Sequence, residues 1–148
     1  MTTGPVDPYV NFNYLVEIDG IARGAFHEVN GLDSTIDVIE HREGGANTTP
    51  YKLPGQTKYA NIVLRWGMTI DNQLWLWHKA AVDGAADGKL DRRNGSVVLL
   101  DRRGQEVARW NFVRAWPSKY TAPSLSAEAS DIAIESVEIV HEGLDRVS

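Results

Sequence analysis

The stretch that decides the fold class is FNYLVEIDG, residues 12–20. The Asp19-Gly20 pair at its end favours a two-residue turn, because both turn positions take positive φ. Before this turn, apolar side chains occupy every second position, which is the period of a strand with one buried face: Phe12, Tyr14, Val16 and Ile18. The stretch therefore predicts a strand that turns back directly into an antiparallel neighbour.

Strand patterns continue along most of the chain. Residues 21–29 and 34–40 alternate in the same way, with Asn30-Gly31 as a turn between them, so three consecutive antiparallel strands are expected. The remaining predicted strands are residues 61–67, 96–100, 106–116 and 131–142. The chain is therefore predicted to be mainly β, a small β-barrel or sandwich of about seven strands.

The last predicted strand changes phase. Ile132 and Ile134 stand at even positions, whereas Val137 and Ile139 stand at odd ones. Two interpretations remain open. The strand has a β-bulge near Glu135-Ser136, or both of its faces are covered.

One segment has a helical period. Leu74, Trp77, His78 and Ala81 fall at i, i+3, i+4 and i+7, as on one face of a helix. Thr69 or Asp71 is a suitable N-cap and Gly84 a suitable end. A single helix over residues 71–83, flanking the β structure, is predicted.

Residues 41–58, HREGGANTTPYKLPGQTK, follow neither period. A stretch this long without secondary structure is unusual in a compact domain unless it is functional or disordered. Predicted strands flank it, and it contains Tyr51 and Leu53. We therefore interpret it as a long extended loop that packs on another molecule.

Composition limits the possible classes. The 148 residues suit one domain, residues 1–148, in which residues 1–11 form an N-terminal arm. Cysteine is absent, and the net charge of −5 argues against a general nucleic-acid binder. The start of the chain lacks a secretory signal pattern, so synthesis in the cytoplasm without stable membrane insertion is expected.

No motif for chemistry is found. The four histidines lack a metal-ligand spacing, and the serines and glycines match neither a nucleophile elbow nor a phosphate-binding loop. We predict no catalytic residue, cofactor or metal, and therefore no enzyme.

Seven phrases in a fixed order carry a family resemblance: FNYLVEIDG at 12–20, FHEVNGL at 26–32, IEHREGG at 39–45, KLPGQTKYANIVL at 52–64, LWLWH at 74–78, WNFVRAWPSKY at 110–120 and IAIESVEIVHEGL at 132–144. Together they resemble the phage tail tube protein family, whose members also form the inner tubes of phage-derived contractile injection systems. The resemblance implies a fold shared in outline with the Hcp proteins of type VI secretion. It further implies hexameric rings that stack into a tube inside a contractile sheath.

Partners and destination follow from the same resemblance. They are further copies of this chain, the sheath protein, baseplate and tube-terminating proteins, and a payload of protein or nucleic acid in the lumen. The tube is expected to assemble in the cytoplasm and to end in a phage tail or a phage-tail-like particle.

Three groups of residues are predicted to mediate this function. The long loop contacts other subunits through Arg42, Gly44, Gly45, Tyr51, Leu53, Pro54, Lys58 and Tyr59. The helix faces outward, toward the sheath, through Asp71, Gln73 and Lys79. Carboxylates that alternate with core residues line the lumen, or else face solvent or pair with arginines of other subunits: Glu17, Asp37, Glu135 and Glu138.

A different class of function stays open. A soluble β-barrel of this size can hold a small ligand in its interior, so a small-ligand-binding module is the alternative.

Overall fold

A computed structural model describes residues 13–19, 22–42, 44, 50–67, 72–123 and 133–147. It contains one helix, α1 (Gln73–Asp87). The strands are β1 (Asn13–Ile18), β2 (Ala22–Phe26), β3 (Glu28–Asn30), β4 (Ser34–His41), β5 (Tyr51–Tyr59), β6 (Ile62–Gly67), β7 (Arg93–Leu100), β8 (Glu106–Thr121), β9 (Ile134–Val140) and β10 (Gly143–Arg146). The predicted class, mainly β with one flanking helix, is confirmed.

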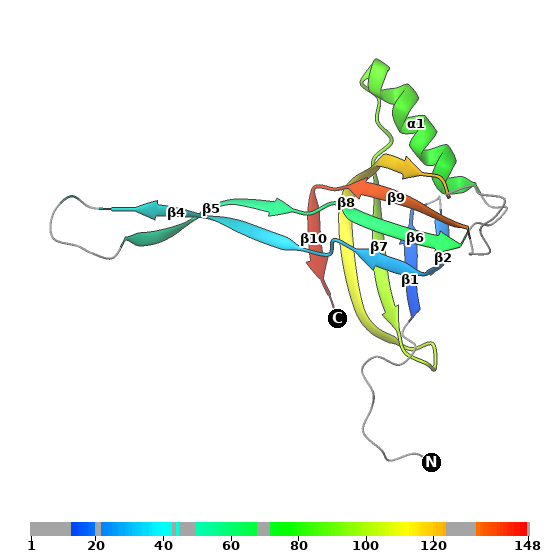
Figure 1. The fold of residues 1–148 in the computed structure, drawn as a ribbon, viewed down its shortest axis with the longest axis horizontal. Helices are drawn as coiled ribbons and strands as arrows, with labels where there is room; N and C mark the ends of the chain where they lie inside the picture. The colour runs from blue at the N-terminus through cyan, green and yellow to red at the C-terminus, as the bar shows by residue number, and fades with distance from the viewer. Residues whose placement is uncertain are drawn as a thin grey trace, which may run out of the picture.

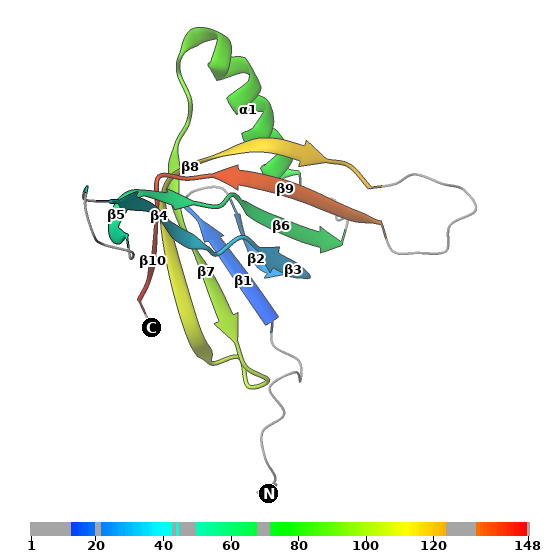
Figure 2. The same ribbon diagram turned by 60° about the vertical axis from the view of Figure 1, so that its left-hand side comes forward.

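One antiparallel sheet forms the body, in the order β2-β1-β7-β8-β9-β6-β3 (Figures 1 and 2). Strand β8 spans 16 residues and pairs with β7 and β10 along its first part and with β9 along its last part. The two ends of this order, β2 and β3, are separated in the chain only by His27, whose backbone N–H donates to the Arg65 carbonyl at 2.8 Å. The sheet therefore curls around a core without closing into a barrel.

The core lies inside this curl. Its largest fully buried side chains come from five strands: Val16, Ile62, Leu64, Val97, Phe112, Val137 and Ile139. Gly95 on β7 makes room for Phe112, because a Cβ at Gly95 would lie 2.4 Å from the phenyl ring. The buried residues alternate along β6 and β9, so the period that predicted these strands reflects one covered face.

Helix α1 covers one end of the core against β8 (Figure 2). Leu74, Trp77 and Ala81 are buried, and the Trp77 indole donates to the Asp91 carbonyl at 3.1 Å. The predicted end at Gly84 was wrong. The helix continues to Asp87 and ends at Gly88, whose φ of 68° suits glycine.

The start of the helix also differs from the prediction. Thr69 and Asp71 lie outside the described residues, and the N-cap is Asn72, which makes no side-chain capping bond. Gly84 lies within the helix, and a larger residue would not fit there, because a Cβ at this position would lie 2.2 Å from the Lys89 carbonyl oxygen.

The largest correction concerns residues 34–59. Residues 34–40 do not form a third strand of the main sheet. Strand β4 pairs with β5, and the two form a separate ribbon that extends away from the body (Figure 1). The extended loop predicted at residues 41–58 therefore overlaps a strand of nine residues, Tyr51–Tyr59. Strand β5 was missed because it is exposed on both faces, and a strand without a buried face has no apolar alternation.

The last predicted strand, residues 131–142, corresponds to β9, and β10 follows it. The pairing of β9 with β6 shows no register shift, so the interpretation as a bulge near Glu135-Ser136 was wrong. Glu135, Val137 and Ile139 lie on the core face, while Ile134 points to the other face and is 40% exposed. The bulge lies on the neighbouring strand, between Pro117 and Lys119 of β8. Ile132 lies outside the described residues.

Candidate assembly surfaces

The ribbon of β4 and β5, here called the hairpin, carries apolar side chains on both faces. Its register runs from Ser34 opposite Tyr59 to His41 opposite Tyr51, with one extra residue on β5. Residues that lie opposite each other, or two apart along a strand, share a face. One face therefore carries Ile36, Val38 and Pro54, and the other carries Ile39, Leu53 and Tyr51.

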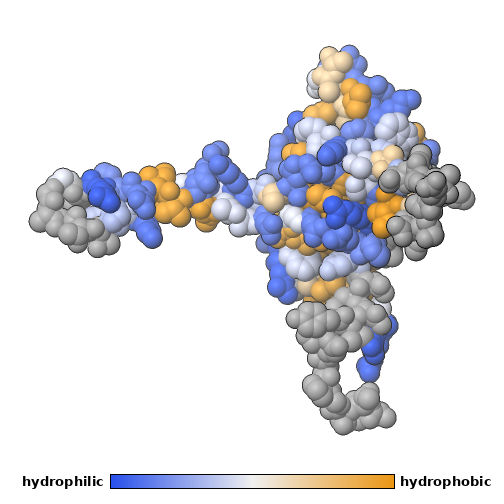
Figure 3. All heavy atoms as spheres, in the orientation of Figure 1, coloured by the Kyte–Doolittle hydropathy of each residue, from blue (hydrophilic) through white to orange (hydrophobic). Residues whose placement is uncertain are grey.

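These side chains are unusually open to solvent. Val38 is 64% exposed and Leu53 is 49% exposed. Apolar side chains gather midway along the ribbon (Figure 3). An isolated two-stranded hairpin is at best marginally stable in water, and large exposed apolar patches on a folded chain mark contact surfaces. Both faces of the hairpin are thus suited to being covered by other protein.

The hairpin is anchored where it joins the body. Gly31, with a φ of 93°, lies so close to Asn61 that a Cβ would fall 1.9 Å from the Asn61 carbonyl oxygen. The buried His141 ring has Nε2 3.1 Å from the Ala60 carbonyl oxygen, and its centroid lies 5.5 Å from that of the Tyr59 ring, at an interplanar angle of 48°. These contacts hold the root of the hairpin on the main sheet.

The predicted loop residues are brought together on this ribbon. Tyr51, Leu53, Pro54 and Lys58 are exposed on β5, and the Lys58 ammonium lies 3.1 Å from the Asp37 carboxylate of β4. Arg42 and Gly44 are exposed beyond β4, and Tyr59 is half-buried at the root. Gly45 lies outside the described residues. The sequence missed Ile36, Val38 and Ile39 as contact residues because their alternation was assigned to a core-facing strand.

Helix α1 presents a second surface. Gln73 and Lys79 are exposed, as the prediction requires, and Asp71 lies outside the described residues. The same outer side also exposes Trp75, Leu76 and Val82, and the Trp75 ring packs 4.9 Å from the Tyr120 ring. The phrase LWLWH contained this information, because four apolar residues in five positions exceed what one buried stripe holds.

The four predicted lumen carboxylates do not form one cluster. Glu17 lies on β1, 3.4 Å from Arg109, and Asp37 lies on the hairpin. Glu138 accepts a 3.0 Å hydrogen bond from the Asn61 amide. The four thus come from three elements, β1, β4 and β9, and have different partners.

Glu135 differs from the other three because it is buried. The Tyr120 hydroxyl donates a hydrogen bond to its carboxylate. Burial, together with this hydrogen bond, raises the pKa of Tyr120 to about 12. In the single chain, Glu135 is therefore covered, with 7% of its surface exposed.

A row of polar side chains crosses the outer face of the sheet over β1, β7, β8 and β10. The register aligns Glu17 of β1, Ser96 of β7, Asn111 of β8 and Asp145 of β10. Ser96 donates to the Asn111 side-chain oxygen at 2.6 Å. The four members of the row are all polar, although Val113, two residues from Asn111 on β8, is 41% exposed. Because its members lie on four strands, sequence spacing alone did not find it.

In the described ranges, no cluster of three or more His, Asp or Glu side chains is arranged to hold a metal ion. The Nδ1 atom of His78 lies 3.0 Å from the Pro117 carbonyl oxygen, so this histidine is hydrogen-bonded to the backbone of β8. Helix α1, the one helix among the described residues, lacks the length and apolar character needed to cross a membrane.

Comparison with solved structures shows the relatives of this fold. A chain of an extracellular contractile injection system, described as the PVC sheath-tube complex in extended state, is 26% identical over 97% of this chain and 92% of that chain, with a TM-score of 0.80. A chain of the PVC sheath/tube terminator in extended state is also 26% identical, over the whole of both chains, with a TM-score of 0.80. Hcp1 from Salmonella typhimurium shares the fold at 14% identity, over 91% of this chain and 85% of that chain, with a TM-score of 0.61.

Comparison at the level of sequence gives the family. No curated protein matches the chain. Residues 10–145 match the family described as T4-like virus tail tube protein gp19, which confirms the predicted resemblance. This chain therefore belongs to the T4-like virus tail tube protein family.

Proposed function

We propose that this chain is the inner-tube subunit of a contractile, phage-tail-like injection system. In this proposal, hexameric rings of the chain stack into a tube inside a sheath. Baseplate and terminator proteins close the two ends, and a payload of protein or nucleic acid passes through the lumen. The observation that carries the proposal is the hairpin, which exposes apolar side chains on both faces.

The hairpin supplies the contact between subunits. Burying an apolar side chain removes it from water and contributes about 25 cal/mol per Å². Val38 and Leu53 of the hairpin are exposed in the single chain, so the gain is realised when other copies pack on them. The anchored root at Ala60 and His141 holds the hairpin in one orientation relative to the body. A fixed orientation suits identical contacts that repeat from copy to copy.

Helix α1 is assigned to the outside of the tube, next to the sheath. Its buried stripe packs on the body, and Gln73, Lys79 and Leu76 remain available on its outer side. Exposed Leu76 and Val82 give this surface an apolar part in addition to the polar contacts that the sequence predicted.

The lumen wall is assigned to the polar row that contains Glu17. Ser96, Asn111 and Asp145 complete this row, and they offer no apolar group to which a moving payload would adhere. None of the four side chains of the row is basic, so the row offers phosphate backbones none of the Lys or Arg contacts that would bind them. Asp37 and Glu138 are assigned to contacts between subunits instead.

No chemistry is assigned to the chain. The alternative, a small-ligand-binding module, has one observation in its favour, a polar pocket beside the start of β7. Sedimentation of the purified chain at micromolar concentration discriminates between the two. The tube proposal expects species of six subunits and larger, whereas a 16.4 kDa monomer that retains a ligand would support the alternative.

A further inference from the structure

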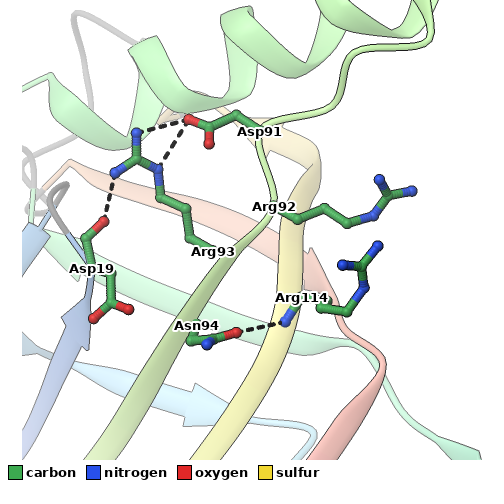
Figure 4. A pocket seen from close by; sticks show the side chains of 6 residues that line it. All are labelled: Asp19, Asp91, Arg92, Arg93, Asn94 and Arg114. Atoms are coloured by element: carbon green, nitrogen blue, oxygen red, sulfur yellow. Dashed lines mark hydrogen bonds and ion pairs between the residues drawn. The ribbon is translucent and has the colours of Figure 1, made fainter.

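A polar pocket lies at the start of β7, next to the end of β1 and the middle of β8. Its volume is about 560 Å³, and three of the side chains that line it are guanidinium groups: Arg92, Arg93 and Arg114. The other lining residues are Asp19, Asp91 and Asn94 (Figure 4). The tube proposal assigns none of these residues a role.

Arg93 forms part of the wall of the pocket. Its Nε and Nη2 atoms bind the Asp91 carboxylate at 3.0 and 2.8 Å, and Nη1 donates to the Asp19 carbonyl at 2.6 Å. These bonds pair the Arg93 guanidinium with a carboxylate of its own chain. Arg93 thereby joins the β1 end to the start of β7 and fixes the frame in which the other two arginines stand.

Arg114 is held in a conformation that favours glycine. Among the described residues other than glycine, it alone has a positive φ, of 52°. It lies at a bulge of β8 opposite Asn94, whose side-chain oxygen accepts from the Arg114 backbone N–H at 3.0 Å. Glycine adopts this backbone conformation without steric cost, whereas a residue with a Cβ adopts it only at a steric cost. Such strained residues cluster at functional sites, so an arginine here indicates a use for its side chain.

Arg92 supplies positive charge that no carboxylate of the described residues neutralises. It is exposed, and across the described ranges no carboxylate forms an ion pair with it. Arg114 pairs with Glu142, and its exposed guanidinium keeps further N–H donors. Figure 4 shows Arg92 and Arg114 extending to the same side of the pocket. The lining thus carries three positive and two negative side chains, in a protein whose net charge is −5.

We propose that Arg92 and Arg114 receive a carboxylate from a neighbouring copy of this chain. Guanidinium groups bind carboxylates with short, charge-assisted hydrogen bonds, and two of them around one pocket give the contact a defined direction. The neighbouring copy is the source because the chain has 20 acidic residues against 15 basic ones, so its own surface offers carboxylates in excess. The inference rests on the proposed tube function, and it adds a polar contact to the apolar one made by the hairpin.

The test uses the full chain with the substitutions Arg92→Ala and Arg114→Gly. Arg114→Gly removes the guanidinium but keeps the bulge, so the variant should melt at the same temperature as the original chain or higher. Each variant should nevertheless raise the concentration for half-maximal assembly about tenfold. Arg102→Ala, an equal charge change in the exposed β7–β8 turn, is the matched control and should leave assembly unchanged.

Three results would overturn the inference in distinguishable ways. Assembly of both variants at the concentration of the original chain would show that the pocket makes no contact between copies. Unchanged assembly, with inorganic phosphate raising the melting temperature of the original chain but not of the Arg92→Ala variant, would assign the pocket to a free anion. Failure of the original chain to assemble would sink the tube proposal and this inference with it.

Discussion

Arg109 on β8 reaches across β7 to Glu17 on β1, with its Nη1 atom 3.4 Å from the carboxylate, and also binds Glu106 at 2.9 Å. Val98 of β7 lies opposite Arg109 in the register. Its neighbour Val97 lies on the core face, so Val98 lies on the outer face, and yet it is only 1% exposed. The arginine therefore acts both as a partner for two carboxylates and as an apolar cover for a valine on the outer face.

Removing either partner should weaken the folded chain by different amounts. Glu17→Gln deletes only a half-exposed ion pair, so we expect a loss of about 0.5 kcal/mol in the free energy of unfolding that shrinks in high salt. Arg109→Ala also uncovers Val98, and we expect a loss of about 1.5 kcal/mol that salt reduces only partly. Urea unfolding at low and high salt measures both. Equal losses for the two variants would contradict the covering role.

The two faces of the hairpin can be tested one at a time. Val38→Glu and Leu53→Glu each place a charge on one face, at positions that are open to water in the single chain. The free energy of unfolding should change by less than about 0.5 kcal/mol, because surface substitutions away from special features have little effect. Assembly, followed by light scattering, should be lost in both variants.

The control for these variants is Val107→Glu, since Val107 is 46% exposed on the body. It should assemble as the original chain does. Deletion of residues 45–51 tests the same contact more severely and should leave a folded monomer without tubes. If tubes formed from Val38→Glu or from the deletion, the hairpin would not be the contact between subunits.

The bond between Tyr120 and the buried Glu135 predicts a pH dependence. The folded-state pKa of Tyr120, about 12, lies above the ordinary value of about 10, so the neutral phenol is favoured by folding. The stability that it contributes is complete below pH 10 and is lost as the pH rises from about 10 to about 12. Tyr120→Phe should lack this loss in alkaline unfolding experiments.

At neutral pH the same substitution leaves Glu135 without its hydrogen-bond donor. An unsatisfied buried group costs roughly 1–3 kcal/mol, so Tyr120→Phe should unfold more easily by about 2 kcal/mol. A neutral effect at pH 7, together with an unchanged alkaline profile, would show that the bond does not form in solution.

The outward position of α1 is tested by Lys79 and Leu76. Crosslinks from Lys79 in whole particles should reach the sheath protein and not the payload. Leu76→Glu should leave tubes intact, because Leu76 is exposed, and should reduce the amount of sheath that co-sediments with them. Crosslinks from Lys79 to payload would place the helix in the lumen instead.

Sequence alone predicted the elements that have one buried face. Strand β1 alternates between core and surface, and the Gln73–Asp87 helix buries a stripe, so their periods follow directly from packing. Strand β5 was lost because it has no buried face in its own chain. The end of the helix was placed too early because Gly84 is a glycine for packing reasons, while Gly88 is the one that needs positive φ.

The candidate surfaces were predicted only in part for the same reason. Tyr51 and Leu53 were identified because apolar residues in an aperiodic stretch need an explanation, and the hairpin provides it. Ile36 and Val38 were missed, since alternation cannot distinguish a face covered by the core from one covered by another molecule. Glu135 looked like an exposed carboxylate because the sequence does not show that Tyr120 lies next to it.

Electron microscopy of the purified full chain at micromolar concentration tests the tube assignment most directly. The account predicts rings of six subunits stacked into tubes, with both faces of each hairpin, at Val38 and at Leu53, covered by other copies. Isolated 16.4 kDa particles, or tubes in which the hairpins project into solvent, would contradict it.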